Sequence, residues 1–157
     1  MNHVEFERFS NHYVLKLAPG EEVMAMLCDF MEHQMIRGAY FVAFGAFERV
    51  RLEYFDMQAK EYRHNDIGQQ VEVVSLLGNV ARGEDGIIVH MHGIVADDQT
   101  RTYSGHLSEG IVRPTLEVFV TQLIGEIRRQ KDPESGLELL NLQQAPSLAG
   151  AQPGLRS

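Results

Sequence analysis

The chain has 157 residues, 44% of them apolar, which is the length of one ordinary domain with a sizeable buried core. Its formal net charge of −8 opposes binding to a phosphate backbone, and no cluster of lysine and arginine compensates for it. The single cysteine, Cys28, excludes a disulfide within the chain and favours a reducing compartment. The N-terminal residues lack the apolar core of a signal peptide, and no run approaches the roughly 18 apolar residues of a membrane span. A cytoplasmic location is therefore expected.

The first predicted elements are a strand and a helix. Polar and apolar residues alternate over residues 12–17, as in a half-buried strand. The segment "APGEE" then supplies a turn and two carboxylates that suit a helix N-terminus. Gly38 is expected just beyond the helix, where a C-terminal residue in the left-handed conformation is common. The helix between them is predicted from apolar residues at helical spacing, namely Val23, Met24, Met26, Leu27, Phe30 and Met31.

Beyond this helix the pattern is typical of β-strands. Residues 39–47 are apolar on both alternating faces, as in a strand buried on two sides, and residues 49–57 alternate apolar with polar. Because only short polar turns separate the strands, antiparallel pairing is predicted, and the fold class is α+β with one main helix and six or more strands. The further strands are predicted over residues 69–81, 86–96, 102–107 and 113–123.

The predicted strands belong to a single domain over residues 1–142. Residues 143–157 are rich in Gln, Ala, Pro, Gly and Ser. Such a segment has too little apolar surface to offset the entropic cost of ordering. It is therefore predicted to be a flexible C-terminal tail.

Three of the seven histidines lie close together, in the predicted hairpin over residues 87–107. His90 and His92 are two residues apart and share one face of a strand. If the turn is centred near Gln99, position 92 lies opposite position 106, where facing Cβ atoms approach to roughly 5 Å. His106 then joins the same face. Three neutral imidazoles are the ligand set expected for a divalent metal, with zinc as the first choice and one position left for water or substrate.

Simpler interpretations of these residues remain open. Two histidines in an alternating strand often just occupy its solvated face, and it is the third histidine that favours a metal site. Glu117 shares a strand face with Thr115 and Phe119. It is a candidate fourth ligand, outer-shell residue or proton acceptor, and the alternative is an exposed carboxylate. The remaining histidines stand in scattered polar contexts and are predicted to lie at the surface, at His3, His12, His33 and His64.

Five blocks of this sequence resemble, in order and spacing, the PPC domain family, the plant and prokaryote conserved domain also called DUF296. The resemblance covers residues 8 to about 125, in "YVLKLAPGEEV", "VEVVSLLGNVA", "IIVHMHGIV", "YSGHLSEGIV" and "RPTLEVFV". It implies an antiparallel α+β fold, similar to that of acetolactate decarboxylases, and a homotrimer. It also implies metal binding at His90, His92 and His106. Where the family block usually reads Gly-Gly-His-Leu, this chain has Ser104 before Gly105, which leaves the histidine in place.

Two functions fit these observations. In the first, the chain is a stand-alone, prokaryotic, trimeric metal-binding domain whose site binds or transforms a small molecule. Water on such a metal would have its pKa lowered toward about 7, although whether the chain is an enzyme is left open. In the second, it is a non-catalytic regulatory or protein-interaction module.

The family also carries a DNA-binding label, which the resemblance traces to the AT-hook of plant relatives. An AT-hook is an Arg-Gly-Arg-Pro type of segment that enters the minor groove. The segments "IRGA" and "ARGE" of this chain lack the second arginine and the proline. Together with the negative net charge, this argues against direct DNA binding.

Overall fold

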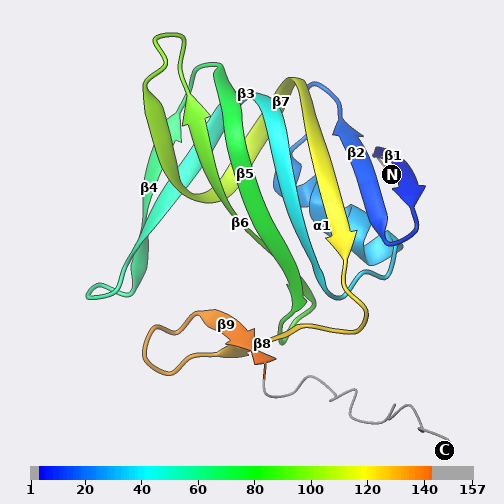
Figure 1. The fold of residues 1–157 in the computed structure, drawn as a ribbon. Helices are drawn as coiled ribbons and strands as arrows, with labels where there is room; N and C mark the ends of the chain where they lie inside the picture. The colour runs from blue at the N-terminus through cyan, green and yellow to red at the C-terminus, as the bar shows by residue number, and fades with distance from the viewer. Residues whose placement is uncertain (1–3, 143–157) are drawn as a thin grey trace, which may run out of the picture.

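The computed structural model describes residues 4–142, so the tail predicted over residues 143–157 lies outside the described residues. This part of the chain forms one helix and nine strands, and the α+β class is confirmed (Figure 1). No helix within it is long and apolar enough to span a membrane. The elements are β1 (Glu5–Phe9), β2 (His12–Leu17), α1 (Val23–His33), β3 (Ala39–Asp56), β4 (Glu61–Ile67), β5 (Val71–Arg82), β6 (Ile87–Ala96), β7 (Thr102–Gln122), β8 (Arg128–Lys131) and β9 (Glu138–Asn141).

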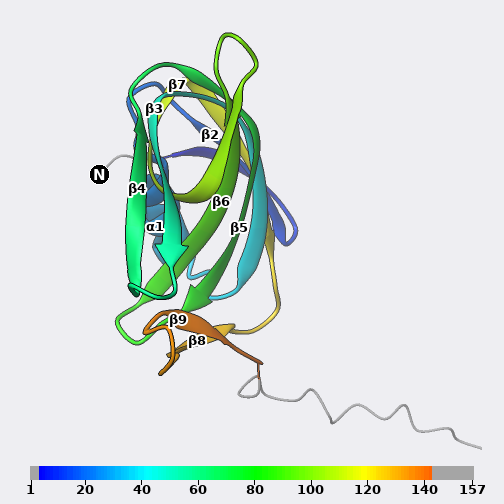
Figure 2. The same cartoon turned by 90° about the vertical axis from the view of Figure 1, so that its left-hand side faces the viewer.

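The strands form one strongly curled sheet. Its path runs β1, β2, β7, β3, β5, and β6 pairs with both β5 and β7, so that β3, β5, β6 and β7 pair in a closed cycle. All of these pairings are antiparallel, as the short turns predicted. β4 pairs with the C-terminal part of β3, from Val50 to Asp56. The β8–β9 hairpin joins the sheet through one parallel bridge between Arg82 and Arg128, and Figures 1 and 2 show it below the ends of β5 and β6.

Two of these strands are longer than predicted. Residues 39–47 and nearly all of residues 49–57 lie in β3, and residues 102–107 and 113–123 both lie largely in β7. Irregularities in the β3–β7 pairing let these strands bend without ending, and one of them begins at Gly45. Gly45 has φ 145°, and a Cβ at this position would lie 2.3 Å from the backbone oxygen of Thr115. Only glycine allows that conformation and that close approach.

The helix α1 covers one face of the sheet. It begins as predicted, because the Glu22 carboxylate accepts hydrogen bonds from the backbone N–H groups of Met24 and Ala25, at 3.1 and 2.7 Å. Its end differs from the prediction, since the residue in the left-handed conformation is Met35 (φ 54°) and not Gly38. The apolar side of the helix packs on β6 and β7 through the buried residues Val23, Met26, Leu27, Phe30 and Met31.

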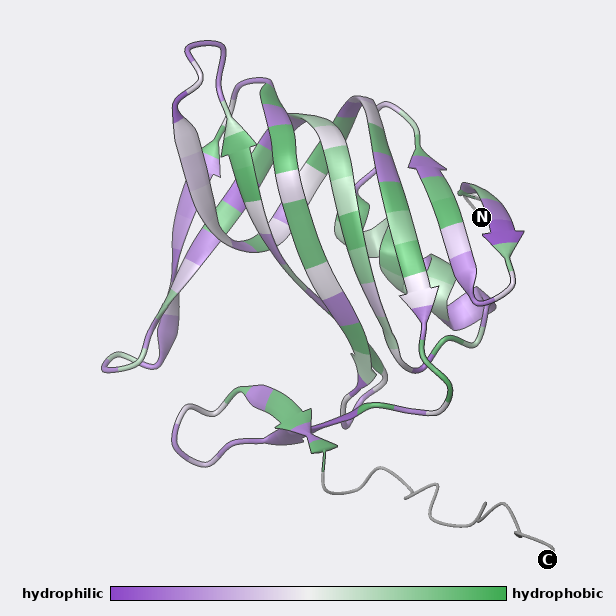
Figure 3. Cartoon of the chain, viewed as in Figure 1, coloured by the Kyte–Doolittle hydropathy of each residue, from purple (hydrophilic) through white to green (hydrophobic). Residues whose placement is uncertain are grey.

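The opposite face of the central strands is apolar but exposed. Leu77, Val42 and Phe119 are neighbours across β5, β3 and β7, and they are 57%, 42% and 39% exposed. Phe44 stacks on Phe119 with 5.8 Å between ring centroids. Figure 3 shows how apolar these strands are. The segment 39–47 was predicted to be buried on two sides, and a single chain covers only one of them.

Candidate metal centre

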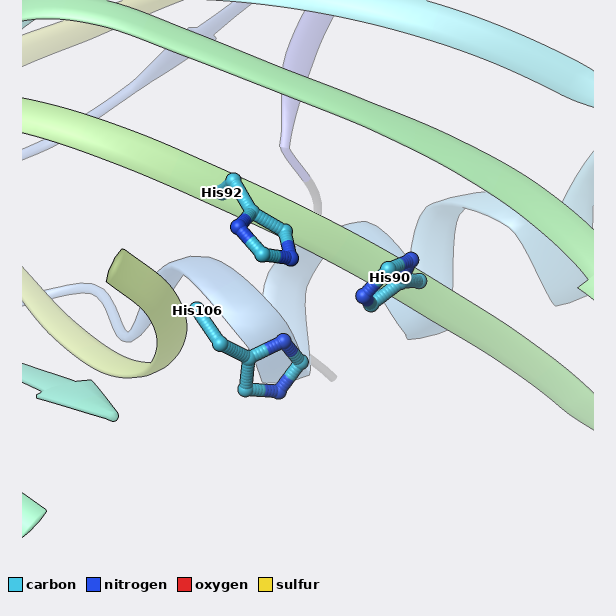
Figure 4. Close-up of side chains that lie close together, drawn as sticks. All are labelled: His90, His92 and His106. Carbon is cyan, nitrogen blue, oxygen red and sulfur yellow. The ribbon is translucent and has the colours of Figure 1, made fainter. Parts of the chain in front are cut away.

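The hairpin of β6 and β7 brings three histidines together. Its register places His92 directly opposite His106, as predicted from a turn near Gln99. His90 lies two residues earlier, on the same face of β6. One ring nitrogen from each histidine lies within 4.8 Å of the other two, and Figure 4 shows the three imidazoles grouped around a common space. The structure therefore assembles the three histidines that the spacing indicated.

A buried carboxylate holds the turn of this hairpin. Asp97 follows β6, and it accepts hydrogen bonds from the backbone N–H groups of Gln99 and Arg101, from the Arg101 guanidinium and from the Tyr103 hydroxyl. Burial would raise the pKa of this carboxyl, but the donors outweigh it and hold the pKa of Asp97 below its ordinary value. The ionised side chain thus stabilises the turn that sets the register of the histidines.

The three rings are packed against one another. Their centroids are 5.1 Å apart for His90 and His92, 5.1 Å for His90 and His106, and 5.5 Å for His92 and His106. Tyr62 of β4 stacks on His106 at 5.2 Å. The Nδ1 atom of His106 is buried and has no hydrogen-bond partner among residues 4–142. Buried polar atoms normally have a partner, and a coordinated ligand is one way to supply it.

The surroundings keep two of these imidazoles, those of His90 and His106, neutral. Burial, the positive charge of Arg129 and the other two histidines lower the pKa of His90 to about 4. Burial and His92 also lower the pKa of His106, while Glu53 opposes the shift and Arg129 adds to it. A histidine must be neutral to bind a metal. At pH 7 His90 and His106 are therefore in the form that a metal requires.

This donor set fits a four-coordinate divalent ion. Zinc binds imidazole nitrogens at about 2.0 to 2.1 Å, which places neighbouring ligand atoms about 3.3 Å apart in a tetrahedron. The ring nitrogens already lie within 4.8 Å of one another, so modest side-chain rotations would bring them to that spacing. Three protein ligands leave the fourth position open, which is typical of catalytic and ligand-binding zinc sites and not of structural ones.

Glu117 does not join this cluster. It lies beside Lys16 of β2 and Phe44 of β3, whereas His106 lies opposite Glu53, near the other end of β3. The expectation that Glu117 could be a fourth ligand or proton acceptor is therefore not met, and its side chain is exposed. The other histidines were predicted to lie at the surface. This is confirmed for His12, His33 and His64, whereas His3 lies outside the described residues.

A cavity of about 610 Å³ surrounds the histidines. Glu53, Tyr62 and Arg129 line it, from β3, β4 and β8 respectively. The Glu53 side chain is only 8% exposed, and its Oε1 lies 2.8 Å from Nδ1 of His64. The sequence did not indicate these three residues as part of the site, because polar and charged strand residues of this kind are usually solvated. Glu53 could be found only from its position directly opposite His106 in the β3–β7 pairing, and the sequence alone does not give that pairing.

Residues 4–124 match the pattern of the Plants and Prokaryotes Conserved (PCC) domain, which is more than half of the chain. The chain belongs to the PCC family. PCC and PPC are two abbreviations for the same plant and prokaryote conserved domain, so this match confirms the resemblance that the five sequence blocks carry. A metal-containing protein from Archaeoglobus fulgidus is 32% identical to this PCC chain, with a TM-score of 0.78, and the match covers 90% of this chain and 99% of that one.

Other proteins similar to the PCC chain differ in name and in length. A protein from Bacteroides thetaiotaomicron with a proposed DNA-binding role has a TM-score of 0.87, covering 91% of this chain and 100% of its own, but at 22% identity it shows the fold alone. Acetolactate decarboxylase from Bacillus subtilis also shares the fold, at 12% identity and a TM-score of 0.53, over 74% of this chain and 54% of that one. The bifunctional protein GlmU from Synechococcus is 28% identical over 144 residues, which are 90% of this chain and only 22% of that relative.

Proposed function

We propose that this PCC domain binds one divalent metal ion, zinc by preference, through His90, His92 and His106, and uses it to bind or transform a small molecule. The observation that carries the proposal is the convergence of three imidazoles on one cavity. The metal-containing relative from Archaeoglobus fulgidus supports it. A bound metal would supply a Lewis acid to whatever occupies its fourth position.

Metal content measured against pH tests this proposal. At pH 7 the purified protein is expected to carry about one ion per chain. Protons compete with the metal, and each ligand's affinity falls about tenfold per pH unit below its pKa. An ordinary histidine titrates near pH 6.5, but the pKa of His90 is about 4. We therefore expect release to begin below about pH 6.5 and to be complete only below about pH 4. Elemental analysis after dialysis at each pH measures it, and metal still bound at about pH 3 would point to other ligands.

We also propose that the exposed apolar face of β3, β5 and β7 joins copies of this chain into a homotrimer. Large exposed apolar patches typically mark protein interfaces. The row formed by Leu77, Val42 and Phe119 also continues to the metal centre, because Leu77 is the direct neighbour of His92 in the β5–β6 pairing. A partner subunit that covers this face would therefore lie beside the histidines and restrict access to them.

Binding to duplex DNA is not expected at physiological salt. Phosphate contacts require lysine or arginine, and the chain has 14 of these against 22 acidic residues. The basic run at residues 128–131 is also engaged internally, since Arg128 bonds Glu126 and Arg129 bonds Asn79. Titration of a labelled duplex at about 0.15 M salt is expected to show no appreciable complex. Micromolar binding that weakens steeply with salt and disappears in the Arg128→Ala/Arg129→Ala variant would instead support a regulatory role.

A further inference from the structure

The C-terminal hairpin brings a fixed positive charge to the histidines. Apart from the histidines, Arg129 carries the only basic side chain among the described residues that line the cavity. Its guanidinium donates to the backbone oxygen of Glu138 at 2.7 Å and to Oδ1 of Asn79 at 2.9 Å. Its Nε is buried and has no partner within residues 4–142. Because a guanidinium has five N–H donors, the two bonds orient Arg129 and still leave donors for a ligand.

The charge of Arg129 acts on the site itself. It lines the same cavity as the three histidines, and it bonds Asn79, which is the direct neighbour of His90 in the β5–β6 pairing, so it lies close enough to influence a ligand held there. Burial lowers the pKa of Arg129 as well, but an arginine remains protonated at pH 7. A permanent cation beside the three histidines favours an anionic ligand.

Two carboxylates limit the charge of that anion. Glu53 and Glu138 also line the cavity, so a dianion such as phosphate would face two negative groups there. A carboxylate carries one negative charge and matches the planar guanidinium in shape. The remaining wall includes apolar side chains, among them Phe55, Leu137 and Leu139, which suit a short carbon skeleton.

We propose that the cavity takes a small monocarboxylic acid, whose carboxylate pairs with Arg129 while a second oxygen takes the open metal position. This assignment rests on the proposed metal-binding function. The β8–β9 hairpin that supplies Arg129 lies beyond residues 4–124, which match the PCC pattern. Selection of the ligand therefore depends on a segment outside the matched domain, placed at the end of the sheet (Figure 2).

Ligand binding to the Co²⁺-loaded protein tests this assignment, because the visible absorption of Co²⁺ changes when a ligand enters its open position. The probes are glycolate, its neutral analogue glycolamide, and inorganic phosphate. Glycolate is expected to bind at least about tenfold tighter than either of the others. The Arg129→Ala variant is expected to bind glycolate about ten- to a hundredfold more weakly, as the loss of a charged hydrogen bond implies, and to bind glycolamide unchanged.

Two further variants control this experiment. Arg129→Lys keeps the charge and should recover part of the glycolate affinity, whereas Arg128→Ala should not change it, because Arg128 bonds Glu126 instead. Circular dichroism checks that each variant is folded. With Co²⁺ bound, equal affinities for glycolate and glycolamide, tighter binding of phosphate, or an unchanged glycolate affinity in Arg129→Ala would each overturn the assignment alone. Failure of the native protein to take up Co²⁺ would overturn the metal proposal and this assignment together.

Discussion

The His92→Ala variant is expected to lose its bound metal, from about one ion per chain to less than about a tenth. His92 is one of three residues whose nitrogens lie within 4.8 Å of one another, so its removal leaves two protein ligands. Loss of a residue that only orients a ligand already weakens metal binding about 10- to 100-fold, and loss of a ligand itself should cost more. Elemental analysis after gel filtration measures the change.

His12→Ala is the matched control for this variant. His12 is also an exposed strand histidine, but its Nδ1 lies 3.0 Å from the hydroxyl of Thr121, far along β7 from the metal centre. Thermal unfolding gives a second readout, since a metal that binds only the folded chain raises its stability. A chelator should lower the Tm of the native protein and of His12→Ala, and leave that of His92→Ala unchanged. Full metal content in His92→Ala would show that the ligands lie elsewhere.

The Val42→Arg variant is expected to be a monomer of 17.8 kDa, whereas the native protein is expected to have about three times that mass if the proposed trimer forms. Val42 stands at the centre of the exposed apolar row, between Leu77 and Phe119. In a single chain an arginine at this position reaches water. In an assembly that covers the row, each copy would bury an unpaired charge, at a cost of several kcal/mol. Light scattering coupled to size-exclusion chromatography measures the mass.

Met57→Arg is the matched control for the oligomer. Met57 is 50% exposed, in the turn between β3 and β4 and away from the apolar row, so its replacement should leave the native mass unchanged. Circular dichroism establishes that both variants keep the native secondary structure. A native protein with the mass of one chain would contradict the proposed trimer, and a Val42→Arg variant with native mass would place the contact on another surface.

The sequence by itself determined the elements that build the core. Helical spacing and the carboxylate of Glu22 predicted α1, and alternation or continuous apolar runs predicted the central strands, because burial of one face imposes those periods. The strands that it did not indicate are peripheral: all five residues of β1 are exposed, β4 is largely polar, and β8 and β9 have four residues each. Edge strands of this kind bury little, so they leave no apolar period to detect.

The grouping of the three histidines could also be predicted from the sequence. His90, His92 and His106 lie on one hairpin, so strand parity and the position of the turn suffice to place them on a common face. For Glu117 strand parity gave the correct face, since Glu117 and Phe119 are exposed, but parity does not give the distance along a strand. β7 has 21 residues, and Glu117 and His106 stand far apart on it.

Only the tertiary structure decided what surrounds the histidines. Glu53 reaches His106 through the bulged pairing of β3 with β7, Tyr62 arrives with β4, and Arg129 comes from a hairpin that follows the whole sheet. These contacts join segments far apart in the chain, and the pairings that bring them together leave no local pattern in the sequence; the pairing of β3 with β7 also contains register shifts. The ligand set could be predicted because its geometry is local, whereas the charge that is proposed to select the ligand depends on how distant strands pack.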